Sequence, residues 1–179
     1  YMPTTAHWTQ KGVTLKQECQ RPAERSTIRV VANSKQLKAN YRFAMKLRVP
    51  YWATKGFDVK LNGKSIATHY QPSTYVEIPA RRWSAKDVVE VTMPFIEHID
   101  FGPDKIDNQW LGAFMRGPLV MAATGIKTWD EATVDLTYSP SHPLTSSPSH
   151  PLTSSPTHLH FIPDYDGDQH LTHYFRLHL

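Results

Sequence analysis

Apolar and polar side chains alternate along residues 43–63, FAMKLRVPYWATKGFDVKLNG. In two runs every second residue is apolar, which is the period of a strand with one buried face, because successive side chains point to opposite sides. Asn62-Gly63 closes the second run and supplies the positive φ angles that a tight hairpin turn needs. The pattern predicts two strands with Pro50-Tyr51-Trp52 between them as a structural step, and a hairpin after the second strand.

Similar short runs recur about every ten residues with turn-forming residues between them, which is typical of an antiparallel sandwich. The runs are TIRVVA (27–32), YVEI (75–78), DVVEVTMP (87–94) and PLVMAAT (118–124). No segment keeps the apolar stripe of a helix, although PDKIDNQWLGAFM (103–115) is open to one short helix or to a loop that leads into a strand. The predicted fold class is all-β, an antiparallel β-sandwich of jelly-roll or immunoglobulin-like type with little helix.

Composition divides the chain into three parts. Residues 1–130 hold the alternating runs and are predicted to form the sandwich domain. Residues 131–160 contain SPSHPLTS twice in succession and the start of a third copy. This Pro-, Ser- and His-rich stretch is predicted to be a linker or a long loop, because proline removes backbone donors and Ser and Thr bury little apolar area. Residues 161–179 regain alternation and are predicted to supply a last strand that returns to the sandwich.

The net charge of +4 is unevenly distributed. Residues 1–130 carry 19 Lys and Arg against 11 Asp and Glu, whereas residues 131–179 carry one Arg against five acids. The cations are spread over many strands and mixed with acids, so no nucleic-acid partner is predicted. No apolar run approaches the roughly 18 residues of a membrane span, so no membrane partner is predicted either. The chain opens without an initiator Met and enters a strand-like run at once, and we expect a fragment of a larger protein.

Three aspartates of the C-terminal segment, Asp164, Asp166 and Asp168, resemble the start of a calcium-binding loop. Alternate carboxylates can converge on a hard cation. The spacing then departs from the EF-hand, because Gly167 stands at the fourth loop position and Phe175 at the twelfth, where a Glu is required. The aspartates are weak metal candidates, and no metal site or cofactor is predicted for this chain.

Neither histidine pairs nor the single cysteine strengthen a metal or nucleophile hypothesis. His170 and His173 are three residues apart, so on a strand they face opposite sides and cannot share one ion. Cys19 is the only cysteine, which excludes an internal disulfide. It is flanked by Glu18 and Gln20 in TLKQECQRP and not by a basic residue. A G-x-S-x-G nucleophile motif is absent.

Four acids cluster in FIEHIDFGPDKIDNQW, namely Glu97, Asp100, Asp104 and Asp107. Glycoside hydrolysis needs two carboxyl groups on opposite sides of the scissile bond. Acids clustered between strands are more often part of a solvated loop, and their spacing in sequence fixes no separation in space. A small enzyme that uses these acids is kept as a hypothesis, and no catalytic residue is assigned.

Aromatic residues offer the other candidate site, because an exposed ring can stack on the apolar face of a sugar. Trp52 and Trp83 stand at strand ends and are predicted to pack in the core. Trp110 and Trp129 stand in predicted loops, and with Tyr70 they are the candidate carbohydrate-binding residues. Packing within or between domains is the alternative role for all of these rings.

The order of four motifs makes the chain similar to a known family. KLRVPYWATKGFDVKLNGK, a Tyr-containing strand, RRWSAKDVVEVTMP and FMRGPLVMAA together resemble the β-sandwich that follows the catalytic barrel in the β-L-arabinofuranosidase family, glycoside hydrolase family 127. The match covers roughly residues 1–125. The tail FIPDYDGDQHLTHYF is similar to the closing strand of a Bacteroides-type branch, whereas the octapeptide repeat departs from the family pattern.

The resemblance implies a non-catalytic C-terminal accessory domain. In the family, catalysis resides in an upstream (α/α)6 barrel that carries a cysteine nucleophile, a zinc held by cysteines and a glutamate, and a glutamate acid/base. None of these residues maps onto this chain. The implied partners are the barrel of the same polypeptide, a second copy in a homodimer and a plant glycan, and the implied location is periplasmic or secreted. The alternative function is a carbohydrate-binding module that uses the loop Trp and Tyr residues.

Overall fold

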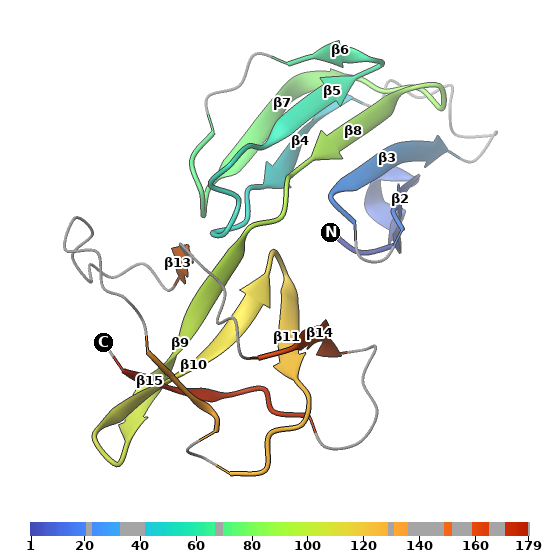
Figure 1. The fold of residues 1–179 in the computed structure, drawn as a ribbon. Helices are drawn as coiled ribbons and strands as arrows, with labels where there is room; N and C mark the ends of the chain where they lie inside the picture. Colours follow the sequence, from blue (N-terminus) through green and yellow to red (C-terminus); the bar gives the residue numbers. More distant parts are fainter. Residues whose placement is uncertain are drawn as a thin grey trace. The chain divides into compact units, whose positions relative to one another are not determined.

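The computed structural model describes residues 1–20, 23–32, 42–66, 70–128, 131–135, 149–151, 159–164 and 171–178. Trp129, Asp166, Asp168 and nearly all of the octapeptide repeat lie outside these residues. The chain divides into two compact units, unit 1 at Tyr1–Pro94 and unit 2 at Phe95–Leu179, each built from strands (Figure 1). This division falls inside the range 1–130 that the sequence pattern grouped into one domain.

Unit 1 contains two antiparallel sheets in its described residues. One sheet has the strand order β1-β2-β3-β8-β5-β6, and the other pairs β4 with β7. The bounds are β1 (Thr4–Trp8), the short 3-10 turn η1 (Thr9–Lys11), β2 (Val13–Glu18), β3 (Arg25–Ala32), β4 (Arg42–Arg48), β5 (Asp58–Leu61), β6 (Lys64–Ser65), β7 (Tyr75–Arg82) and β8 (Val88–Thr92).

The core of unit 1 follows the alternation of the sequence. Strand β4 buries Phe43, Met45 and Leu47 and exposes the residues between them. The larger sheet buries Val30, Val59, Val89 and Val91 among others. Each large apolar side chain removed from water contributes about 1.5–3 kcal/mol. The burial pattern gives each sheet one buried and one exposed face, as the period of two requires.

Two tryptophans confirm the packing role predicted for them. Trp52 and Trp83 are both buried. The ring of Trp83 stacks on Phe43 with 5.5 Å between centroids, and its Nε1 donates a hydrogen bond to the carbonyl oxygen of Phe43 at 2.8 Å. A buried indole needs such an acceptor for its N–H. The Pro50-Tyr51-Trp52 step is therefore scaffold, since it ends strand β4 and places a ring in the core.

The predicted hairpin at Asn62-Gly63 is also confirmed. These residues join β5 to β6 and have φ angles of 54° and 78°. Positive φ at both central residues is the pattern of a type I′ turn, which glycine and asparagine adopt most easily.

Unit 2 forms one further sheet in its described residues. Strand β10 pairs with β9 along one edge, and β11 and β15 share its other edge. All pairings are antiparallel except that of β12 with β15. The bounds are β9 (Glu97–Ile106), β10 (Gln109–Arg116), β11 (Leu119–Ala123), β12 (Thr133–Asp135), β13 (Ser149–Pro151), β14 (Phe161–Pro163) and β15 (Phe175–His178).

The structure corrects the prediction for residues 103–115. They form the β9–β10 hairpin rather than a helix or a loop before a strand. The turn residues Asp107 and Asn108 have φ angles of 50° and 62°. Asp and Asn tolerate positive φ better than other residues with side chains, so they can occupy a tight turn without glycine.

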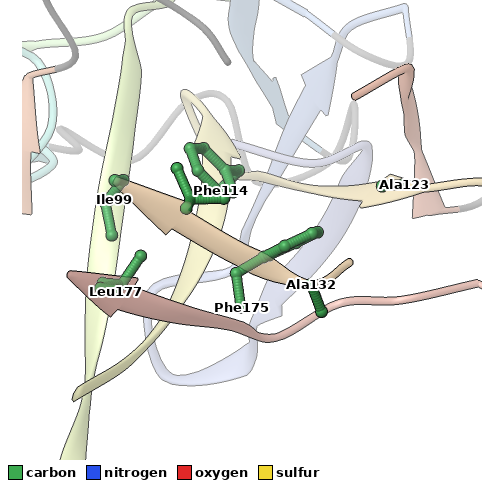
Figure 2. Packing of buried hydrophobic residues seen from close by; sticks show 7 residues of the cluster. Ile99, Phe114, Ala123, Ala132, Phe175 and Leu177 are labelled. Atoms are coloured by element: carbon green, nitrogen blue, oxygen red, sulfur yellow. The ribbon is translucent and has the colours of Figure 1, made fainter. Parts of the chain in front are cut away.

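The core of unit 2 depends on the C-terminal segment. Ile99, Phe114, Ala123, Ala132, Phe175 and Leu177 come from five parts of the unit and converge on one apolar cluster (Figure 2). Three phenylalanine rings form its centre, with centroid distances of 4.7 Å for Phe114–Phe161, 5.0 Å for Phe114–Phe175 and 5.5 Å for Phe161–Phe175. Two of the three rings follow the octapeptide repeat, so the alternation at the chain's end builds this core.

The all-β, antiparallel prediction is confirmed by both units. In the described parts of the chain, no helix is long and apolar enough to cross a membrane.

Candidate functional site

Tyr70, the first candidate for sugar binding, belongs to unit 1 and is half-buried. Its ring lies 6.2 Å from the buried ring of Phe57 at a tilt of 52°. The space beside its hydroxyl borders Gly56, where an added Cβ would lie 4.0 Å from the Tyr70 oxygen. One side of the ring is thus engaged in the core of unit 1.

Trp110, the second candidate, lies on strand β10 of unit 2 and not in a loop as predicted, and it is also half-buried. It packs against the apolar cluster of that unit and meets the ring of Phe101 edge-on, with 6.1 Å between centroids. The ammonium nitrogen of Lys105 lies 5.1 Å from the ring centroid, over the face of the indole. A sugar that stacks on this face would have to displace Lys105 and its cation–π contact.

Tyr70 and Trp110 lie in different units, so neither unit contains both rings. Trp129 lies outside the described residues. The sequence-based assignment of Tyr70, Trp110 and Trp129 to carbohydrate binding stays a prediction.

The four clustered acids are distributed along the β9–β10 hairpin. Glu97 and Asp100 stand three residues apart on β9, so their side chains project to opposite faces of the strand. Asp104 is further along β9 and exposed. Asp107 is in the turn, where Nη2 of Arg176 on β15 donates to its Oδ2 at 3.3 Å. The hairpin therefore uses at least one of these acids to hold the last strand.

His98 on β9 is the buried polar residue that the sequence analysis missed, with 0% of its surface exposed. Its Nδ1 lies 3.2 Å from Oδ1 of Asp100, and its Nε2 lies 3.0 Å from the carbonyl oxygen of Gly117. The contacts tie β9 to the turn between β10 and β11. The signal was present in EHID, because residues two apart on a strand share a face and can hydrogen-bond to each other.

Asp87 is the centre of a buried polar network in unit 1, with only 6% of its surface exposed. Its Oδ1 accepts from Nδ2 of Asn62 at 2.8 Å and from Nη2 of Arg81 at 3.4 Å, and its Oδ2 accepts from the backbone N–H of Ser84 at 2.8 Å. Oδ1 of Asn62 in turn accepts from the backbone N–H of Val88 at 2.9 Å. The Asn62-Gly63 turn and the Ser84–Asp87 turn are thereby joined.

The charge of Asp87 is stabilised by this network. Burial raises the pKa of the carboxyl group, but the hydrogen bonds from Asn62 and Ser84 and the positive charge of Arg81 outweigh it. The pKa of Asp87 is therefore below its ordinary value. The network is a structural clamp, since every donor in it comes from a turn or strand end of unit 1.

Metal-ligating residues are not grouped in the described part of the chain, where no three His, Cys, Asp or Glu side chains could hold one ion together. Oδ1 of Asp164 lies within hydrogen-bond distance of Nε2 of His173. Asp166 and Asp168 lie outside the described residues, so the three aspartates stay weak metal candidates that are not tested as a group. The thiol of Cys19 faces the carbonyl oxygen of Tyr1 at 3.7 Å.

Comparison with known proteins gives one family and a group of similar solved structures. The sequence model described as the middle domain of β-L-arabinofuranosidase GH127 matches residues 1–95. This range ends next to the boundary between units 1 and 2 at Pro94. The predicted family is confirmed, but the predicted position is corrected, because the matched domain is the middle domain and not a C-terminal one.

Two of the similar solved structures are a glycoside hydrolase and a GH127 β-arabinofuranosidase. The first is 29% identical over 66% of this chain and 19% of its own, with a TM-score of 0.51. The second is 26% identical over 68% of this chain and 21% of its own, also with a TM-score of 0.51. The chain thus spans about a fifth of the length of these structures. No curated protein sequence matches it.

Proposed function

Because the chain belongs to the β-L-arabinofuranosidase family GH127, we propose that it is a non-catalytic scaffold portion of a glycoside hydrolase. In this proposal the chemistry takes place in a catalytic barrel elsewhere in the same polypeptide, and the two units brace that barrel or take part in a homodimer contact. The observation that carries the proposal is the agreement between the matched range, residues 1–95, and the compact unit Tyr1–Pro94.

The described polar side chains support a scaffold role. The buried carboxylate of Asp87 joins two turns, and the buried imidazole of His98 joins a strand to a turn. A catalytic acid or base needs to reach a substrate atom at hydrogen-bond distance. Both groups instead have partners within their own unit, which suits a role in holding strands together.

Release of sugar from a synthetic substrate tests the proposal. The purified chain is incubated with 4-nitrophenyl β-L-arabinofuranoside, and the GH127 β-arabinofuranosidase of known structure serves as the active control. We expect nitrophenol release by the control and none above buffer by the chain. Turnover by the chain that disappears in Asp100→Asn or Asp104→Asn would contradict the scaffold proposal and favour the small-enzyme hypothesis.

A carbohydrate-binding module is the second candidate function. The half-exposed rings of Tyr70 and Trp110 favour it, since each retains some surface that a sugar can reach. Titration of Trp emission with arabinan oligosaccharides distinguishes the two. The scaffold proposal predicts a flat titration, whereas a saturable change that is lost in Trp110→Ala would favour glycan binding at this residue.

A further inference from the structure

The exposed face of the β4–β7 sheet is a basic surface. Strand β4 alternates between buried and exposed positions, and β7 does so from Tyr75 to Pro79. A register shift between Phe43 and Met45 then brings Arg82 opposite Arg42, and paired residues share a face of the sheet. The antiparallel register places Arg42 opposite Arg82, Lys46 opposite Glu77 and Arg48 opposite Tyr75. We define the basic face as Arg42, Lys46, Arg48, Tyr75, Glu77 and Arg82.

Four cations and one acid make up the charges of the basic face. Glu77 is the only acid in the sequences of β4 and β7, and it lies 3.6 Å from the ammonium nitrogen of Lys46. Arg42 donates through Nε to the carbonyl oxygen of Ala80 at 3.1 Å, which fixes its stem and leaves its charge without an acid on these strands. The face therefore has a local excess of positive charge.

The exposed face of the larger sheet in unit 1 differs, although it belongs to the same unit. Its cations Lys16, Arg25, Arg29 and Lys60 are mixed with Glu18, Asp58 and Glu90. Glu18 pairs with Lys16 and Arg29, and Lys60 stands opposite Glu90 in the register. The charges on that face are nearly balanced, with four cations against three acids, whereas the basic face has four cations against one acid.

Tyr75 adds an aromatic platform to the basic face. Its surface is 58% exposed, and the guanidinium carbon of Arg48 lies 5.4 Å from its ring centroid. An aromatic ring can stack on the apolar face of a pyranose, and a neighbouring guanidinium can bind a carboxylate through two parallel hydrogen bonds. Ring and cation side by side suit a ligand that carries both a sugar ring and a carboxylate.

We propose that the basic face binds an oligosaccharide of uronic acids. The carboxylates of the sugar would pair with Arg48, Arg82 and Lys46. One uronate ring would stack on Tyr75 and displace the guanidinium of Arg48 from the ring to the carboxylate of the sugar. Glu77, in the middle of the face, would accept hydrogen bonds from the hydroxyl groups that every uronic-acid ring carries, whereas the phosphates of a nucleic acid offer no donor. The inference rests on the proposed function in one respect, namely that the ligand with the carboxylates is a sugar.

The experiment titrates the full chain with tetragalacturonate by isothermal calorimetry. We expect saturable binding that weakens as the salt concentration rises, because exposed charges are screened. The variant Lys46→Gln/Arg48→Gln/Arg82→Gln should bind at least tenfold more weakly. The matched control Lys16→Gln/Arg29→Gln/Lys60→Gln removes the same charge from the larger sheet and should bind within twofold of the unchanged chain. Circular dichroism checks that each variant keeps its fold.

Three results would overturn the proposal. The first is the absence of saturable binding to tetragalacturonate, and the second is an equal loss of affinity in both triple variants, which would indicate attraction by overall charge alone. The third is tighter binding of a thymidine oligonucleotide than of a uronate of equal charge. A Tyr75→Ala variant that binds several-fold more weakly would support the stacking role. Failure of uronate binding leaves the scaffold proposal intact, whereas hydrolysis of the nitrophenyl substrate would contradict only the scaffold proposal.

Discussion

Units 1 and 2 carry opposite charge. Residues 1–94 contain 16 Lys and Arg against 6 Asp and Glu, a net charge of +10, and residues 95–179 contain 4 against 10, a net charge of −6. The division by composition at residue 130 hid this contrast, because it added the acids of the β9–β10 hairpin to a basic domain. The structural boundary shows that the basic charge belongs to the range matched by the family.

The cores of the two units differ as well. Unit 1 buries mainly aliphatic side chains of consecutive strands and closes two turns with the Asp87 network. Unit 2 depends on three phenylalanine rings, two of which come from the last strands of the chain. The core of unit 1 is built from the roughly ninety residues of the matched domain. The core of unit 2 needs residues from both the start and the end of that unit's sequence.

The largest expected effect is the loss of stability of unit 2 in the variant Phe175→Ala. The ring is fully buried against Phe114 and Phe161, so its loss should cost unit 2 about 3–5 kcal/mol of unfolding free energy. Urea unfolding followed by circular dichroism measures the change. Tyr174→Ala is the matched control, because this neighbour is 57% exposed and should change the stability by about 0.5 kcal/mol or less. Equal effects of the two variants would refute the aromatic core of unit 2.

Gly112→Ala tests the close packing where β9, β10 and β15 meet. A Cβ at this position would lie 2.5 Å from Cδ1 of Leu177 and 2.8 Å from Cγ2 of Ile99, so we expect a loss of about 1–3 kcal/mol. Gly102→Ala on β9 is the control, because its nearest neighbour would be 3.4 Å away, an ordinary contact. Thermal unfolding compares the two, and a Gly112→Ala chain as stable as Gly102→Ala would contradict the packing.

Asp87→Asn should weaken the polar network of unit 1 by about 1–3 kcal/mol. The amide keeps the size of the carboxylate but brings N–H donors toward Asn62, Arg81 and Ser84, which already donate. Chemical unfolding measures the loss. Asp58→Asn at an exposed position of β5 in the same unit is the control and should stay within about 0.5 kcal/mol of the unchanged chain.

The contribution of the Asp87 charge should also depend on pH. Its pKa in the folded chain lies below the ordinary value, so the unfolded state binds more protons in the acidic range and stability rises with pH there. The full contribution is present above the unfolded pKa of about 4 and is lost as the pH falls through the lower folded pKa. The stability difference between the unchanged chain and Asp87→Asn should narrow between neutral and acidic pH. A difference that stays constant would exclude this linkage.

Local sequence pattern predicted most of the strands of unit 1, because alternation and turn residues act over a few positions. Phe43, Met45 and Leu47 and the Asn62-Gly63 turn were identified in this way. The same reasoning failed at residues 103–115, where Asp107 and Asn108 form a glycine-free hairpin turn. Nor did alternation mark the boundary at Pro94, since strands continue on both sides of it.

Candidate sites were harder to predict because they depend on contacts between residues far apart in the chain. The exposure of Trp110 is limited by Phe101 and Lys105, which no period in the sequence places beside it. The basic face appears only once the register brings Arg42 opposite Arg82. His98 was missed although one of its two partners, Asp100, stands two residues away on the same strand.

The folding of residues 1–94 as a separate polypeptide tests most directly whether unit 1 is a self-contained sandwich module. We predict a β-type far-UV spectrum and a single cooperative thermal transition. The variant Phe43→Ala should strongly lower the midpoint temperature of that transition. A chain of residues 1–94 that has no cooperative transition and gains one only when residues 95–179 are present would contradict the account.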